Sequence, residues 1–172
     1  MHFFLLFTLC EVLLLLFALA GHIVAPGLFR LRFHCASRDF LLAVLVGTGC
    51  FLILLLLGLY PSFTEAVTMF HRSFQKVPLM FSLPVTLLLV PLAEEGIFRG
   101  VLPAITGPVL SNVLFGILHM RSGYTILVPL AAILIGFVFH KAYEHSGRNL
   151  FVPVVAHVLF NALRLAVFVH WA

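Results

Sequence analysis

Long apolar runs, separated by short polar connectors, dominate the pattern of the chain. The runs lie at about residues 3–23, 40–60, 79–103, 107–121, 124–143 and 150–171. A helix of about 20 consecutive apolar residues is long enough to cross the hydrocarbon core of a bilayer. The pattern therefore predicts an all-α protein, a polytopic transmembrane helical bundle of about six helices.

The composition agrees with a membrane location. Hydrophobic residues make up 63% of the chain and charged residues only 9%, whereas roughly 25% of the residues in soluble domains are charged. The net charge of +4 is spread over the connectors and forms no basic stripe interleaved with aromatic residues, so nucleic acid is not an expected partner. The three cysteines include no C-x-x-C pair and predict neither a disulfide framework nor a zinc site.

The chain divides into two parts within one integral membrane domain, residues 1–172. Residues 1–75 form an N-terminal transmembrane hairpin and a connector, in which "YPSFTEAVTMFHRSFQK" mixes apolar and polar residues at helical spacing and predicts an interfacial helix. The first run is expected to be a retained helix and not a signal peptide, because Glu11 interrupts it and no basic residue precedes it. The distribution of Lys and Arg over the connectors favours an outside N-terminus.

Several polar side chains fall inside the apolar runs, where they are costly and usually functional. They are Glu11, Glu94, Glu95, Arg99, His119, His140, Asn161, His157 and Arg164. The densest stretch is "LAEEGIFRG", residues 92–100. His140 lies beside Lys141 near the end of a run, so we expect it at the membrane interface.

Four of these side chains are expected at a similar depth. The turn near residues 104–107 and the turn before the sixth run lie on the same side of the membrane, because two crossings separate them. At 1.5 Å per residue, Glu94 lies about 15 Å and His119 about 18 Å from the first turn. His157 and Asn161 lie about 10 Å and about 16 Å from the second turn. We therefore expect one shared polar site.

Local spacing assigns different positions to the two adjacent glutamates. Glu95 and Arg99 are four residues apart and share a helix face, so an ion pair between them would partly offset the cost of burying either charge. Glu94 points about 100° away from that face and remains available for another task. Pro91 removes a helix hydrogen bond just before the pair and predicts a kink.

Three motifs follow one another on successive predicted helices. "EEGIFR" fits E-E-x-x-x-R, "FGILH" fits F-x-x-x-H and "HVLFN" fits H-x-x-x-N. In this order, they resemble the CPBP family of intramembrane proteases, which includes the type II CAAX prenyl endopeptidases and bacterial proteins once called abortive-infection proteins. The resemblance covers residues 80–165, a CPBP-like catalytic core.

This resemblance implies an endopeptidase that hydrolyses a peptide bond with a glutamate-activated water and without a metal or other cofactor. Glu94 would be the base and His119 would hold the water, while His157 and Asn161 would stabilise the tetrahedral intermediate. Glu95 and Arg99 would support the site. The expected substrate is a membrane-anchored or lipid-modified peptide, such as a C-terminal sorting signal or a precursor peptide, in a prokaryotic inner membrane.

Three alternatives stay open at the level of sequence. In a zinc-dependent version of the same protease, two Glu and two His would bind Zn²⁺, although the chain has no H-E-x-x-H and Arg99 would place a positive charge near the ion. A non-catalytic immunity or scaffold protein would keep the fold and act by binding. A small transporter or proton relay would be expected to show a duplicated half, which the sequence lacks.

Overall fold

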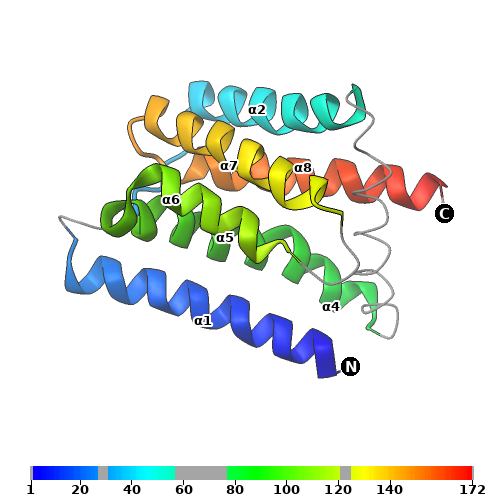
Figure 1. The fold of residues 1–172 in the computed structure, drawn as a ribbon, viewed down its shortest axis with the longest axis horizontal. Coiled ribbons are helices and arrows are strands. Elements are labelled where there is room, and N and C mark those ends of the chain that lie inside the picture. Colours follow the sequence, from blue (N-terminus) through cyan, green and yellow to red (C-terminus); the bar gives the residue numbers. More distant parts are fainter. Residues whose placement is uncertain (1, 27–30, 57–76, 121–124, 172) are drawn as a thin grey trace.

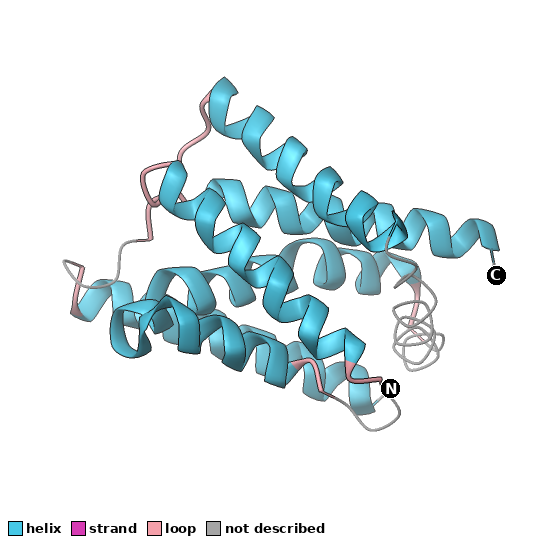
Figure 2. Cartoon of the chain, turned by 45° about the horizontal axis from the view of Figure 1, so that its top comes forward, coloured by secondary structure: helices cyan, strands magenta, loops and turns pink. Residues whose placement is uncertain are grey.

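Helices account for the regular structure of the described residues. The computed structural model describes residues 2–26, 31–56, 77–120 and 125–171. In chain order its elements, with η for a π-helical stretch, are α1 (His2–Val24), α2 (Ser37–Leu56), α4 (Leu79–Pro84), η1 (Val85–Leu89), α5 (Val90–Glu95), η2 (Gly96–Val101), α6 (Leu102–Leu118), α7 (Leu127–His145) and α8 (Phe151–Trp171). The predicted all-α class is confirmed (Figure 2), since no strand occurs within the described ranges.

The long apolar helices fit a polytopic membrane bundle. The stretches long and apolar enough to cross a membrane, among those described, are Leu5–Val24, Ser37–Leu56, Met80–Leu118 and Leu127–His145, and Phe151–Val167 is a shorter apolar helix. Large side chains such as Ile23 and Leu56 are exposed on the outside, as expected for helices that face lipid. The interfacial helix predicted in the connector before residue 77 lies outside the described residues.

The longest of these stretches is a hairpin. Gly107 has a φ of 78° and a ψ of 160°, and Pro108 follows it. Glycine adopts this conformation without the steric penalty that a Cβ would bring. The chain therefore reverses near the turn predicted from the sequence (Figure 1), and the Ser111 hydroxyl donates a hydrogen bond of 2.9 Å to the Phe98 carbonyl of the other arm.

Helix α8 lies at the centre of the bundle. It packs against α2 and α7 and also against η1 and α5, while α1 packs against α5 and η2, and α6 against α7. Figure 1 shows α1 along one face of the bundle and α2 along the opposite face. The central helix therefore brings the H-x-x-x-N motif against the arm that carries the E-E-x-x-x-R motif.

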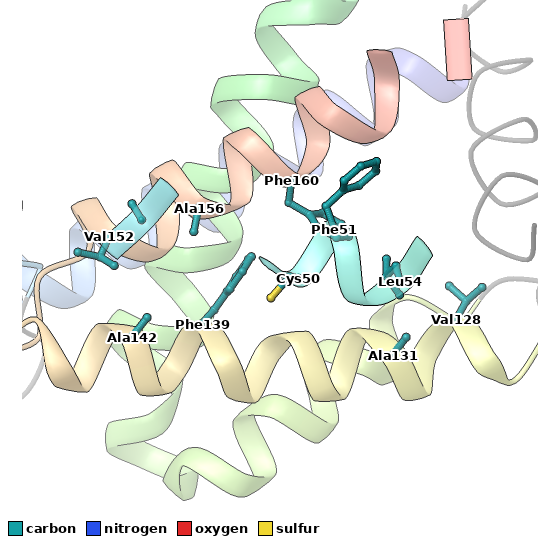
Figure 3. Close-up of a cluster of buried hydrophobic side chains, with 11 residues drawn as sticks. Cys50, Phe51, Leu54, Val128, Ala131, Phe139, Ala142, Val152, Ala156 and Phe160 are labelled. Atoms are coloured by element: carbon teal, nitrogen blue, oxygen red, sulfur yellow. The ribbon is translucent and has the colours of Figure 1, made fainter. Parts of the chain in front are cut away.

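A cluster of buried apolar side chains joins α2, α7 and α8 (Figure 3). Its members are Ala43, Cys50, Phe51, Leu54, Val128, Ala131, Phe139, Ala142, Val152, Ala156 and Phe160. Many of them are small, which lets helices approach closely. At Gly47 the backbones of α2 and α8 are in contact, because a Cβ added there would lie 2.5 Å from the Ala156 carbonyl oxygen.

Asn149 ties the start of α8 to the connector between α1 and α2. Its side chain is buried and donates hydrogen bonds of 2.7 Å to the His34 carbonyl and 2.9 Å to the Asp39 carboxylate. Its amide oxygen accepts hydrogen bonds from the backbone N–H groups of His34 and Phe151. These contacts attach the first residue of α8, Phe151, to the connector and to the start of α2, six residues before His157.

Candidate active site

The backbone around the two glutamates departs from a regular α-helix. Helix α5 carries Glu94 and Glu95 and lies between the π-helical stretches η1 and η2. The Val90 N–H donates to the Val85 carbonyl, five residues back, and Pro91 has no N–H to donate. The Thr86 carbonyl is therefore left for a side chain, and the Asn161 amide donates to it at 3.4 Å. The proline thus frees an acceptor for α8 instead of ending the helix.

Both oxygens of the Glu95 carboxylate are held. One oxygen, Oε2, lies 2.9 Å from Arg99 Nε, and both side chains have an exposed fraction of 0%. The other, Oε1, lies 2.8 Å from Nδ1 of His157 on α8. The predicted ion pair is present, and it is extended by a histidine from a distant part of the chain.

Arg99 is enclosed by side chains and backbone from two further helices. Its Nη2 donates a hydrogen bond of 3.2 Å to the Gly136 carbonyl of α7, and its guanidinium lies 4.7 Å from the centre of the Phe115 ring of α6. A Cβ at Gly136 would lie 2.7 Å from Asn112 Oδ1 and 3.5 Å from Arg99 Nη2. The glycine therefore makes room for the Asn112 side chain, while the 3.5 Å distance to Arg99 Nη2 is an ordinary van der Waals contact.

The neighbouring Glu94 has a different environment. Its side chain is 14% exposed, and Oε2 lies 3.9 Å from His157 Nε2. This oxygen is buried and makes no hydrogen bond within the described part of the chain. The His157 ring thus lies between the two acids, with Nδ1 toward Glu95 and Nε2 toward Glu94. The Glu95 carboxylate is thus engaged at close range on both oxygens, whereas Glu94 Oε2 has no partner closer than His157 Nε2 among the described contacts.

His119 lies at the end of α6 and is oriented by its own helix. Its Nδ1 lies 2.8 Å from the Phe115 carbonyl oxygen, which can only accept, so Nδ1 donates and Nε2 is the acceptor of the neutral ring. The rings of His119 and Phe115 are 4.6 Å apart between centres. The same phenylalanine therefore contacts both His119 and Arg99, although no described hydrogen bond or ion pair joins His119 to Glu94, His157 or Asn161.

Asn161 lies one helical turn beyond His157 on α8 and is buried. Its side-chain amide has two N–H donors, of which one is directed to the Thr86 carbonyl. The second remains as a donor for another oxygen. The structure thus brings Glu94, Glu95, Arg99, His157 and Asn161 together at the contact of η1 and α5 with α8, with Phe115 as the link to His119.

The glutamates and histidines of the site are not arranged as the zinc-dependent alternative requires, with two Glu and two His around one ion. Across the described residues, no three His, Cys, Asp or Glu side chains gather closely enough to hold a metal ion. Both Glu95 oxygens and His157 Nδ1 are already engaged with one another and with Arg99. A set of two glutamates and two histidines around one ion would require these contacts to break.

His140 lies near the end of α7, where the sequence predicts the membrane interface, and this depth stays a prediction. Its side chain is buried inside the bundle, and its Nε2 lies 3.6 Å from Glu144 Oε1. Successive residues of a helix are rotated by about 100°, so the exposure of Lys141 does not predict the exposure of its neighbour His140.

Two residues of the site were not identified from the sequence. Gly136 supplies a backbone carbonyl to Arg99, and Thr86 supplies the carbonyl that Pro91 leaves without a helical hydrogen bond.

Comparison with known proteins finds one family and one relative. The model of a family described as type II CAAX prenyl endopeptidase Rce1-like matches residues 76–163, just over half of the 172 residues, including all three motifs. A protein of Bacillus subtilis (strain 168), described as uncharacterized protein YpbD, is 38% identical over 76 residues. The match spans 44% of this chain and only 40% of the length of that relative. No solved structure matches the chain.

Proposed function

The chain belongs to the type II CAAX prenyl endopeptidase Rce1-like family, and on this premise we propose that it is an intramembrane endopeptidase of the glutamic type. The resemblance noted in the sequence is thus confirmed, and the family implies a CAAX-type intramembrane protease. One observation carries the glutamate mechanism: the Glu95 oxygens lie 2.9 Å from Arg99 Nε and 2.8 Å from His157 Nδ1, whereas the Glu94 Oε2 oxygen lies 3.9 Å from His157 Nε2. A general base must have a carboxylate oxygen that is not already committed to a close charged partner.

In the proposed reaction, Glu94 removes a proton from a water molecule while the water oxygen attacks the carbonyl carbon of the scissile peptide bond. The π-electrons of the carbonyl move to its oxygen and form a tetrahedral oxyanion. When the C–N bond breaks, the proton passes from Glu94 to the leaving nitrogen, and the products are a carboxylic acid and an amine. Proton transfer by a positioned side chain contributes typically about 10²–10⁴-fold to the rate.

The histidines and the amide complete the proposed site. Glu95 accepts a hydrogen bond from His157 Nδ1 and fixes the ring with Nε2 toward Glu94. With a proton on Nε2, His157 would donate to the oxyanion together with the second N–H of Asn161. His119, whose Nε2 is an acceptor, would hold the water. In other enzymes, the loss of one oxyanion donor lowers the rate about 10²–10³-fold.

We propose that the substrate is a membrane-anchored or lipid-modified peptide. Glu94 lies within the apolar stretch Met80–Leu118, so a scissile bond must come to it from within the bilayer or from its surface. A C-terminal sorting signal or a precursor peptide has this form, because an apolar segment holds the cleavage site near the membrane. The host membrane would be the inner membrane of a prokaryotic cell.

Cleavage by the reconstituted protein tests the proposal. A membrane-anchored peptide encoded near its own gene would be incubated with the wild type, Glu94→Gln and Glu144→Gln, each with and without a chelator. The last variant makes the same chemical change at an exposed glutamate. We expect the wild type and Glu144→Gln to cleave in the presence of chelator, and Glu94→Gln to be at least about 100-fold slower with an unchanged melting temperature.

Three other results would each contradict a part of this proposal. Unchanged cleavage by Glu94→Gln would remove Glu94 from the role of base. Loss of cleavage with chelator, restored by Zn²⁺, would favour the zinc-dependent protease. Tight binding of the peptide by the wild type without any cleavage would favour a non-catalytic immunity or scaffold protein.

A further inference from the structure

A groove lies between α2 and α7, and none of the residues of the proposed active site lines it. It has a volume of about 620 Å³ and is lined by Leu42, Val46, Val138, Lys141, Ala142, Glu144 and His145. Val138 and Lys141 are exposed, so the groove opens to the surroundings of the bundle. Its lining combines apolar side chains with charged side chains at one end.

The lining follows from the periodicity of the two helices. On α2, Arg38, Leu42 and Val46 are spaced by four residues and share a face. On α7, Val138 and His145 are seven residues apart and also share a face, with Lys141 and Ala142 between them. Helix α2 begins at Ser37 and α7 ends at His145, so the polar residues of both helices lie at the same end. The apolar residues of α2 extend about 12 Å from Arg38 into the membrane-spanning part.

Positive charge predominates at the polar end of the groove. Arg38 Nη2 donates to His145 Nε2 at 3.3 Å and joins the two helices there. The exposed Lys141 ammonium lies 2.8 Å from Glu144. Arg38 and Lys141 thus present two cations against the Glu144 carboxylate. Arg38 is the second residue of α2, and Lys141 is one of the last five residues of α7.

We propose that this groove binds one anionic phospholipid. The phosphate would contact Arg38 and Lys141, and an acyl chain would lie along Leu42, Val46 and Val138. Basic residues at a membrane surface attract anionic lipid headgroups, and long basic side chains reach the headgroups from positions near helix ends. The apolar stripe below the charges fits an acyl chain and would not hold a free phosphate ion.

Lipid retention measured by native mass spectrometry tests the proposal. The purified protein would be equilibrated with micelles that contain phosphatidylglycerol or phosphatidylcholine. We expect phosphatidylglycerol to bind the wild type more tightly, and the double variant Arg38→Gln with Lys141→Gln to bind it about 30-fold more weakly, since each basic residue near a membrane surface contributes about a fivefold attraction. The matched control is Arg32→Gln with Arg148→Gln, which removes two exposed charges. Neither residue lines the groove, and neither has a described hydrogen bond or ion pair with a lining residue, whereas Lys141 lines it and Arg38 is hydrogen-bonded to His145. Arg148 acts on Glu144 only through its electrostatic field.

Two single variants distinguish lipid binding in the groove from non-specific attraction by the charge of the protein surface. Val138→Trp fills the groove and leaves its charges, so it should abolish retention of the lipid, and Glu144→Gln should strengthen it. Equal weakening by both double variants, full retention by Val138→Trp, or equal binding of the two lipids would overturn the proposal. Melting temperatures establish that each variant is folded. Because the measurement follows lipid and not cleavage, its failure leaves the protease proposal unaffected.

Discussion

Glu95 and His157 are 62 positions apart in the sequence, yet their side chains meet at 2.8 Å inside the bundle. The contact joins α5 to α8, and Arg99 holds the other carboxylate oxygen. It orients the histidine ring so that the second nitrogen faces Glu94. The proposed base Glu94 and the supporting Glu95 are therefore adjacent but distinct side chains of α5, with Arg99 following in η2, and substitutions should separate their effects.

Removal of Arg99 should reduce stability, not activity alone. Arg99→Ala leaves the buried Glu95 carboxylate without its ion-pair partner, and breaking a buried pair in this way typically costs about 3–5 kcal/mol. We expect a lower yield of folded protein and a lower melting temperature in detergent, whereas Glu94→Gln should melt like the wild type. A stable Arg99→Ala protein that has lost only its activity would show that the arginine is not a structural residue.

Pro91 should matter for activity more than for stability. Pro91→Ala restores an N–H five residues after Thr86, where it would compete with Asn161 for the Thr86 carbonyl. Such a hydrogen bond is worth about 1 kcal/mol, so we expect cleavage to fall about five- to tenfold while the melting temperature holds or rises.

Pro84→Ala provides the control for this substitution, because it makes the same change at an exposed position at the end of α4. The rates of the two variants would be compared under substrate saturation. If both lower the rate equally, Pro91 acts through general helix stiffness and not through the Thr86 carbonyl.

The contact between α2 and α8 should tolerate no side chain at Gly47. Gly47→Ala would place a Cβ 2.5 Å from the Ala156 carbonyl oxygen, so the helices must separate, and we expect a loss of about 1–3 kcal/mol, as for other overpacked cores. Gly49 lies in the same helix with open space around it, and Gly49→Ala should be neutral or stabilise by up to about 1 kcal/mol. Unfolding in mixed micelles would measure the stability of both variants. A similar change in stability for Gly47→Ala and Gly49→Ala would contradict the close backbone contact at Gly47.

Phe115 should couple Arg99 to His119. Phe115→Leu keeps an apolar side chain but removes the ring that contacts the guanidinium and the imidazole. A buried cation–π contact is worth about 2 kcal/mol, so we expect a loss of that size together with slower cleavage. Phe98→Leu makes the same exchange at a buried ring that packs edge-on against Phe115, and it should lower stability without the same loss of rate. The comparison requires both unfolding and cleavage measurements.

Much of the architecture could be predicted because it depends on local pattern. The apolar runs matched the described helices within a few residues at most ends, since twenty apolar residues in a row have few other stable forms in a bilayer. The pairing of Glu95 with Arg99 followed from a spacing of four on one helix. The turn at Gly107 followed from glycine and proline between two apolar runs. Each of these features is decided by residues close together in the sequence.

The chain by itself thus determined the helices, their order and the Glu95–Arg99 pair, because hydrophobic period and local spacing are properties of neighbouring residues. Only the tertiary structure decided that His157 lies between the two acids, that Gly136 receives Arg99, and that His140 is buried. These depend on how far each helix is rotated and shifted against the next. That rotation and shift come from contacts such as Gly47 against Ala156 and Asn149 against Asp39, which join residues more than 100 positions apart.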